Sequence, residues 1–429
     1  MFESLKNTEL KNLSQEISLI NDFGIRFGKL SKTNCLSMKK IILTSLFFYY
    51  SMSQLFSQEL RNSDKFAFSM LKNLAKNENT FLSPYSIRTI LSLCAEGANG
   101  ATLDEMQKTL YLDADATKRQ KEMQMIIQKI SDAKDFKLLT TNMLWIEKSL
   151  EVLDNYKKLA KDFYMAGAEI LGFKENPEKA RQRINLFVEE KTNKMIKNLL
   201  PANVIDKETK MVLTNTIYFK ADWEYSFDKK NTQKIDFKVN NEKDEKVDMM
   251  YQKNFFKAGI LDGNSVIQLP YKGNKVSMWV ILPKDKNLSE LLKNIDAKLW
   301  TSLKSSVARK DVRLYLPLFE FETKYMLAND LKSMGMPTAF GNGAQFSGIS
   351  RKTSLKISEV IHQAKVKVEE KGTEAAAATA VIMRETSSAH QIDRIDPFIF
   401  KADHPFLFVI EHTETQEILF MGTVQKPTK

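Results

Sequence analysis

The feature that most restricts how this chain can fold is the order of its hydrophobic patterns. A helical pattern comes first and strand-like patterns follow it. Within residues 59–135 the apolar side chains recur at helical spacing, and a further helix is expected from about 177 to 200. After residue 211 strand-like runs dominate, with helical patches near 289–303 and 325–334. Helices early and strands late predict an α+β protein whose helices pack on mainly antiparallel sheets. No Pro/Gly/Ser-rich linker, repeat or low-complexity block divides the chain, so we expect a single large domain.

The N-terminal residues have the order of a secretory signal. A short basic segment starts at Met38, the apolar residues 41–50 follow it, and the small residue Ser57 could precede a cleavage site. We therefore expect residues 1–57 to be an upstream segment and signal peptide, with the true start at Met38. Residues 58–429 would then be secreted, periplasmic or held at the cell surface. An ordinary amphipathic or buried N-terminal helix is the alternative. The chain has no apolar run of about 18 residues that would require a membrane span.

Charge and cysteine content give weaker constraints. The net charge is +11, and the densest basic group, formed by Lys118, Arg119 and Lys121, falls in an expected helix. This group could make a weak polyanion contact, although a solvated helix face is the simpler interpretation. No nucleic-acid-binding motif accompanies it. Cys35 precedes the expected cleavage site and Cys94 lies in an apolar stretch, so a mature chain would carry one buried thiol and no internal disulfide.

Motifs of enzyme chemistry are missing from the sequence. We find no Gly-x-Ser-x-Gly turn, no phosphate-binding Walker loop, no His-Glu-x-x-His and no paired Cys-x-x-Cys. None of the four histidines, His362, His390, His404 and His412, lies in a sequence pattern typical of a nucleophile or a metal site. We therefore expect a protein that is not an enzyme and that needs no metal or other cofactor.

The most unusual local composition is a run of small residues at 372–383. Alanine is the best helix former, so a helix is the simplest interpretation of the run. The alternation favours a strand, because one face would carry only uncharged side chains from Thr373 to Met383. Small side chains expose little apolar surface and could slide between existing strands. Gly372 at the base would supply the backbone freedom of a hinge. The run is therefore suited to a loop that can enter a sheet.

The run and several other segments resemble one protein family. Residues 370–380 resemble the proximal hinge of inhibitory serpins, and residues 400–410 with 418–422 are similar to the C-terminal pattern of that family. Further similar segments are spread over about residues 60–427. The resemblance implies the serpin fold, with an exposed reactive-centre loop at about 370–403, in a secreted and bacterial member. It makes these residues the hinge: Glu370, Gly372, Thr373, Ala375, Ala376, Ala377 and Ala378.

The resemblance also implies a mechanism and the residues that support it. A serpin is a suicide substrate that traps its target protease as a covalent acyl-enzyme, because the cleaved loop inserts into the central β-sheet. Ser83, Ser86, Asn215 and His362 would form the shutter, a hydrogen-bonded cluster beneath the point where that sheet opens. Trp223 would lie at the breach, where the loop begins to enter.

The reactive bond follows from the usual length of the hinge-to-bond segment in the family. Counting seventeen positions from Glu370 gives the bond between Thr386 and Ser387. The segment after Ser387 is longer than is usual in the family, so cleavage after Arg384 or Arg394 remains an alternative.

The residue before the reactive bond indicates the class of target. A small β-branched residue there suits elastase-like or subtilisin-like proteases, and papain-like cysteine proteases are the second choice. A non-inhibitory binding protein of the same fold is the alternative to an inhibitor.

Overall fold

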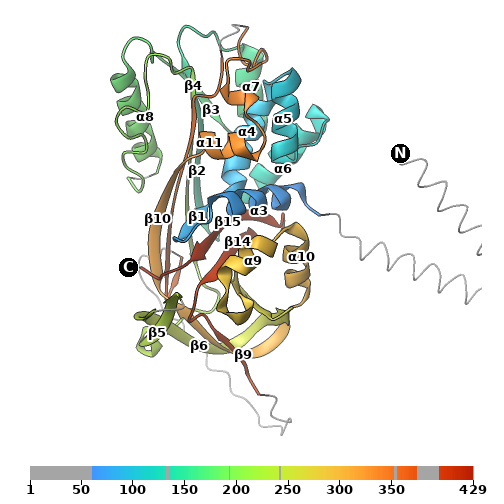
Figure 1. Ribbon diagram of the computed structural model, residues 1–429, viewed down its shortest axis with the longest axis vertical. Helices are drawn as coiled ribbons and strands as arrows, with labels where there is room; N and C mark the ends of the chain where they lie inside the picture. Colours follow the sequence, from blue (N-terminus) through green and yellow to red (C-terminus); the bar gives the residue numbers. More distant parts are fainter. Residues whose placement is uncertain are drawn as a thin grey trace, which may run out of the picture. The chain divides into compact units, whose positions relative to one another are not determined.

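Two β-sheets and the helices that cover them form the body of the protein (Figure 1). The computed structural model describes residues 60–131, 135–192, 194–240, 243–351, 355–373 and 396–428. The α-helices are α3 (Asn62–Leu74), α4 (Pro84–Glu96), α5 (Gly100–Leu110), α6 (Ala116–Ser131), α7 (Asp154–Tyr164), α8 (Pro177–Lys191), α9 (Leu288–Asn294), α10 (Ala297–Ser305) and α11 (Ala328–Met334). Short 3-10 helices lie at Lys229–Asn231, Lys284–Lys286 and Thr338–Phe340. Within these described ranges, no helix is long and apolar enough to cross a membrane.

The smaller sheet has six strands, which follow the order β10-β11-β12-β4-β2-β3. Their bounds are β10 Phe319–Met326, β11 Glu359–Glu369, β12 Gly372–Thr373, β4 Met211–Asp222, β2 Lys137–Glu147 and β3 Gly167–Leu171. β11 and β4 pair in parallel, as do β2 and β3, whereas the remaining pairs are antiparallel. The two long central strands of this sheet, β11 and β4, therefore come from distant parts of the sequence.

The larger sheet has nine strands and contains the C-terminal hairpin. Its order is β1-β15-β14-β8-β7-β6-β9-β13, with β5 paired to β6. The bounds are β1 Thr80–Leu82, β15 Glu417–Val424, β14 Phe406–His412, β8 Val276–Leu282, β7 Asn264–Pro270, β6 Lys243–Leu261, β9 Ala308–Pro317, β13 Phe398–Lys401 and β5 Gln233–Asn240. Only β13 and β9 pair in parallel among these described strands. The expectation of an α+β protein with mainly antiparallel sheets is confirmed.

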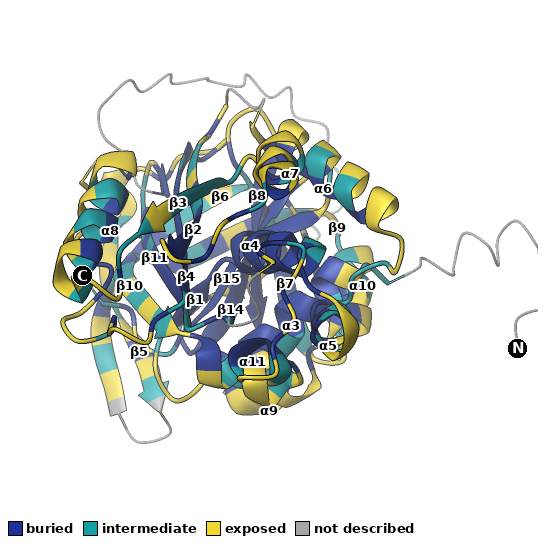
Figure 2. Cartoon of the chain, turned by 90° about the horizontal axis from the view of Figure 1, so that it is seen from above, coloured by how far each residue is buried: buried dark blue, intermediate teal, exposed yellow. Residues whose placement is uncertain are grey.

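Helix α4 lies in the middle of the body, where Figure 2 shows it dark blue. Pro84 starts the helix at a position where its missing N–H needs no partner. The Ser83 hydroxyl oxygen caps this end by accepting a hydrogen bond of 3.2 Å from the backbone N–H of Ser86. Cys94 is a fully buried free thiol, and burial raises the pKa of that thiol. The buried helix thus holds two of the predicted shutter residues against the sheet.

The helix expected to extend to about residue 200 is shorter than its apolar spacing indicated. α8 ends at Lys191, and the hydroxyl of Thr192 donates a hydrogen bond of 2.7 Å to the carbonyl of Val188. Asn198 has a φ of 50°, which a right-handed helix does not allow. The apolar residues beyond α8 are buried from an irregular segment, so hydrophobic spacing alone placed the end of the helix too late.

Candidate functional site

The six-stranded sheet is parted at one end between its two long central strands. Residues 359–364 of β11 pair directly with residues 212–217 of β4. Beyond that stretch, Gly372 and Thr373 of β12 lie between the two strands and pair antiparallel with both. These are the first two residues of the small-residue run. The start of the run is therefore already a strand of the sheet.

Buried aromatic side chains hold this inserted end. The hydroxyl groups of Thr373 and Tyr271 lie 2.6 Å apart, and Thr373 is only 2% exposed. The ring of Trp223 stacks on Tyr271 with centroids 4.4 Å apart. Its indole N–H donates to the carbonyl of Glu369 at 3.0 Å, and its backbone N–H donates to the carbonyl of Lys371 at 2.8 Å. Trp223 thus contacts both the last residue of β11 and the turn that leads into β12.

The remaining hinge residues that the structure describes are also held in place. The backbone N–H of Phe227 donates to the carbonyl of Glu370 at 2.9 Å, and the hydroxyl of Thr232 donates to its carboxylate at 2.9 Å. A Cβ at Gly372 would lie 2.1 Å from the carbonyl oxygen of Ala221, and its φ is not positive. Close approach of β4 therefore requires the glycine in this arrangement, and the expected role of Gly372 as a source of backbone freedom stays a prediction.

The four predicted shutter residues form one hydrogen-bonded cluster. The backbone N–H of Ser83 donates to Nε2 of His362 at 3.1 Å, so Nδ1 carries the proton and donates to Oδ1 of Asn215 at 2.6 Å. The side-chain amide of Asn215 donates to the hydroxyl of Ser86 and, at 2.5 Å, to Oδ1 of Asn142. The cluster joins β11, β4, β2 and α4 in the half of the sheet where β11 and β4 are still paired.

The shutter cluster is uncharged. Burial lowers the pKa of His362 to about 3, so its imidazole stays neutral near neutral pH. His362 and Asn215 are direct partners in the parallel register of β11 and β4. Their side-chain hydrogen bond adds a link between strands that must separate if a further strand is to enter between them.

Two contributors to the site were not predicted from the sequence. Asn142 is the cross-strand partner of Asn215, and no sequence pattern identifies which strands are paired. Tyr271 directly follows Pro270, the last residue of β7, and no role was predicted for it from the sequence. A tyrosine beside a hairpin gives no sign that its hydroxyl contacts Thr373, which lies more than 100 residues away.

Several predicted site residues lie outside the described part of the chain. They are the hinge residues Ala375, Ala376, Ala377 and Ala378, the reactive-bond residues Thr386 and Ser387, and the alternative cleavage points Arg384 and Arg394. The expected signal segment, residues 1–57, lies outside it as well. These assignments stay predictions.

The basic group on α6 is smaller than the sequence indicated. Arg119 is 7% exposed, and its guanidinium forms an ion pair with Glu96 at 3.0 Å. Lys118 is exposed and pairs with Asp113, while Lys121 is exposed. Arg119 is therefore part of the interior and does not belong to an accessible polyanion surface, which corrects the expectation for this residue.

The described histidines do not gather into a reactive group. Nδ1 of His404 lies 2.8 Å from the carboxylate of Asp403, and Nδ1 of His412 lies 2.8 Å from the hydroxyl of Thr415. In the part of the chain that the structure describes, no three or more His, Cys, Asp or Glu side chains are arranged to hold a metal ion.

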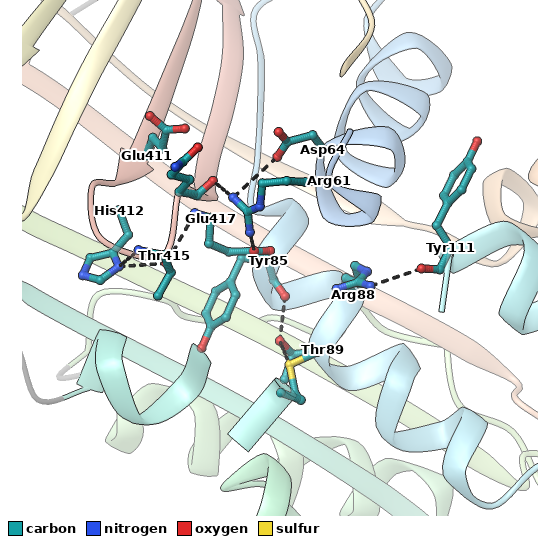
Figure 3. A network of polar contacts seen from close by, with 12 residues as sticks. Arg61, Asp64, Tyr85, Arg88, Thr89, Tyr111, Glu411, His412, Thr415 and Glu417 are labelled. Atoms are coloured by element: carbon teal, nitrogen blue, oxygen red, sulfur yellow. Dashed lines mark hydrogen bonds and ion pairs between the residues drawn. The ribbon is translucent and has the colours of Figure 1, made fainter. Parts of the chain in front are cut away.

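A second buried polar network ties α3 to the C-terminal hairpin (Figure 3). The guanidinium of Arg61 lies 2.6 Å from the carboxylate of Glu417 and 4.0 Å from that of Asp64. Glu411 pairs with Lys304 at 2.5 Å in the same region. Asp64 is 2% exposed, and burial raises the pKa of its carboxyl group to about 7. Three carboxylates thus share two cations in the interior.

Comparison with known sequences finds one protein family that matches almost the whole described part of the chain. Residues 61–427 match the family model described as "Serpin (serine protease inhibitor)". An uncharacterized serpin-like protein of Methanosarcina acetivorans is 39% identical over 373 residues, which cover 85% of this chain and 87% of that protein.

Solved structures with a similar fold include ovalbumin and thyroxine-binding globulin. Uncleaved ovalbumin superposes with a TM-score of 0.77 at 30% identity, covering 85% of this chain and 99% of ovalbumin. Thyroxine-binding globulin in complex with thyroxine superposes with a TM-score of 0.76 at 28% identity, covering 86% and 99% of the two chains.

Proposed function

The chain belongs to the serpin family, and from this premise we propose that it is a protease inhibitor that acts as a suicide substrate. A serine protease would attack the loop that follows β12 and form an acyl-enzyme. The cleaved loop would then enter the six-stranded sheet between β11 and β4 and carry the protease with it. The protein would be consumed in the reaction and would not be an enzyme.

One observation supports this proposal above the others, namely the position of β12. Gly372 and Thr373 already pair with both long strands, so further insertion would extend an existing strand. The next residues in the chain are mostly alanine, which leaves little side-chain volume to pass between β11 and β4. No proline interrupts the run to remove a ladder donor.

The dimensions and energies are consistent with insertion. β4 is 12 residues long, which corresponds to roughly 40 Å at about 3.3 Å per residue. The 16 residues from Lys371 to Thr386 would span roughly 53 Å when extended, so the loop is long enough to reach the far end of β4. About ten new ladder hydrogen bonds, at roughly 0.5 to 1.5 kcal/mol each, would contribute on the order of 5–15 kcal/mol. That is comparable to the stability of a whole domain.

The proposed targets are elastase-like or subtilisin-like proteases. This rests on Thr386 as the residue before the reactive bond, because a small β-branched side chain fits a shallow primary pocket and gives a trypsin-like pocket no cation. Papain-like cysteine proteases are the second choice. We also propose that the protein meets its target outside the cytoplasm, since the segment that begins at Met38 has the order of a secretory signal.

A binding protein without inhibitory activity is the second candidate. The likeness to thyroxine-binding globulin supports it, since that protein was solved with a small molecule bound. The composition of the loop favours the inhibitor, because residues 373–383 contain one charged residue and no proline.

Incubation of the protein with a panel of proteases tests the proposal. An inhibitor gives a covalent complex that survives denaturing electrophoresis, and mass spectrometry of the released C-terminal fragment identifies the bond. We expect a fragment that begins at Ser387. A fragment beginning at Glu385 or Ile395, formed with efficient trapping of a trypsin-like protease, would replace this bond by one of the alternatives. Cleavage of the loop by every protease without any complex would favour the binding protein.

A further inference from the structure

The outer face of the three-stranded edge formed by β6, β9 and β13 carries an unusual set of exposed side chains. In the strand register Lys253 lies opposite Arg313, which in turn lies opposite Ile399 of β13. Residues directly opposite each other point to the same face of a sheet. We call this surface the basic face, and it consists of Lys253, Phe255, Lys257, Arg309, Arg313 and Ile399.

The basic face has more positive charge than its neighbours neutralise. Asp311, the cross-strand partner of Phe255, lies beside these residues and forms an ion pair with Lys253 at 3.2 Å. For Lys257, Arg309 and Arg313, no carboxylate of the described residues lies within 4.0 Å. Three cations are therefore available to an external partner of negative charge.

Apolar surface accompanies these charges. Phe255 is 52% exposed and Ile399 is 62% exposed. The guanidinium of Arg309 lies 4.9 Å from the centroid of the Phe255 ring. A single exposed apolar residue is ordinary. An aromatic ring beside arginines and a second apolar side chain has the composition of the buried centre of a protein interface.

The position of the basic face determines whether a protease bound at the predicted reactive bond could contact it. β6 and β9 lie side by side at the lower end of the molecule in Figure 1, away from α5, α7 and α8. β13 begins at Phe398, eleven residues after Ser387, so the chain can place the predicted bond at most about 36 Å from β13. A protease domain of ~220 residues has a diameter of roughly 44 Å. A protease bound at that bond is therefore large enough to touch the basic face.

We propose that the basic face is a docking surface for the target protease, and that it selects proteases with an acidic surface beside the catalytic cleft. This inference rests on the proposed inhibitory function. A bound polyanion would use the same cations, but it would have no use for the exposed Phe255 and Ile399. Attraction between opposite charges accelerates encounter more than it strengthens the final complex, and salt weakens it.

The test compares two charge-reversal variants that change the net charge equally. Lys257→Glu with Arg313→Glu alters the basic face, whereas Lys293→Glu with Lys298→Glu alters exposed positions on α9 and α10. The association rate constant is measured with two elastase-like proteases, one of net negative and one of net positive charge, each with its nucleophile blocked. We expect a loss of about tenfold at low salt for the basic-face variant with the acidic protease only. Raising the salt concentration should remove most of the difference.

Each other outcome contradicts the proposal. Equal losses for the two variants would mean that net charge acts without a specific surface, and unchanged rates would exclude docking there. If dextran sulfate binds and the basic-face variant loses that binding while its protease rates stay unchanged, the surface serves a polyanion. Because blocked proteases measure docking without trapping, a failure of the inhibitory mechanism shows up separately as the absence of covalent complex with the active enzymes.

Discussion

The hydroxyl groups of Tyr271 and Thr373 lie 2.6 Å apart in the buried region between β11 and β4. This bond links the first residues of the small-residue run to a tyrosine that directly follows β7 of the larger sheet. Trp223 stacks on the same ring, so the pair is shielded from water. The bond therefore favours the arrangement in which β12 has already entered the sheet.

Tyr271→Phe should weaken the attachment of β12 to the six-stranded sheet. The hydroxyl of Thr373 would stay buried without its partner, at a cost of about 1–3 kcal/mol. We expect faster amide hydrogen exchange in residues 369–373 and more protease cleavage per complex formed. Tyr251→Phe on β6 removes a hydroxyl away from the hinge and is the matched control. Unchanged exchange in the Tyr271 variant would mean that backbone pairing alone holds β12.

Thr373→Arg should turn the proposed inhibitor into a substrate. The side chain of Thr373 is buried, and a guanidinium there would have to be desolvated or would expel β12 from the sheet. Cleavage of the loop would then outrun its insertion. The ratio of cleaved to complexed protein, measured on a denaturing gel, should rise strongly, while circular dichroism shows that the fold is kept. A variant that traps protease with unchanged stoichiometry would contradict the role of this residue.

Cleavage of the loop should raise thermal stability. If the intact form is kinetically held short of full insertion, cutting the chain releases the strand to pair with β11 and β4. For a domain of about 370 residues, a gain of 5–15 kcal/mol corresponds to a rise in melting temperature on the order of 6–20 °C. Scanning calorimetry of intact and nicked protein measures it. Equal melting temperatures would favour the binding-protein alternative.

The sequence predicted the class of fold and much of the site for identifiable reasons. Periodicity identified the helices and strands, and the alternation at 372–383 indicated a strand, of which the structure describes the first two residues. Pairing partners such as Asn142 and Tyr271 were not predictable, because a contact across more than 70 residues leaves no local pattern. The exposure of Arg119 was misjudged because its spacing in the sequence did not show which face of the helix it lies on. That face is turned towards Glu96 in the interior.

Stability should fall in mildly acidic solution through His362. Its folded pKa of about 3 lies below the ordinary value of 6.5, so the unfolded chain binds a proton first as the pH decreases. The contribution of the neutral imidazole to the free energy of unfolding is fully present above pH 6.5. It is lost as the pH falls towards 3, by about 1.4 kcal/mol per pH unit. In His362→Gln the urea midpoint should change less between pH 7 and pH 5, whatever its absolute value. An unaltered pH slope would assign the acid sensitivity to other groups.

Asp64 should make the protein less stable as the pH rises, which is the opposite of the effect of His362. Burial raises its pKa from 3.8 to about 7, so the folded protein holds a proton that the unfolded chain releases earlier as the pH rises. The contribution of the protonated Asp64 to the free energy of unfolding is therefore fully present below pH 3.8 and is lost as the pH rises through 7, where this buried carboxyl group loses its proton. Asp64→Asn should raise the urea midpoint at pH 8 by the equivalent of about 1–3 kcal/mol and change it little at pH 4. Asp104→Asn, at an exposed position on α5, is the control. If Asp64→Asn destabilises the protein at pH 8, the ionised carboxylate is a needed partner of Arg61 and is better compensated than its burial implies.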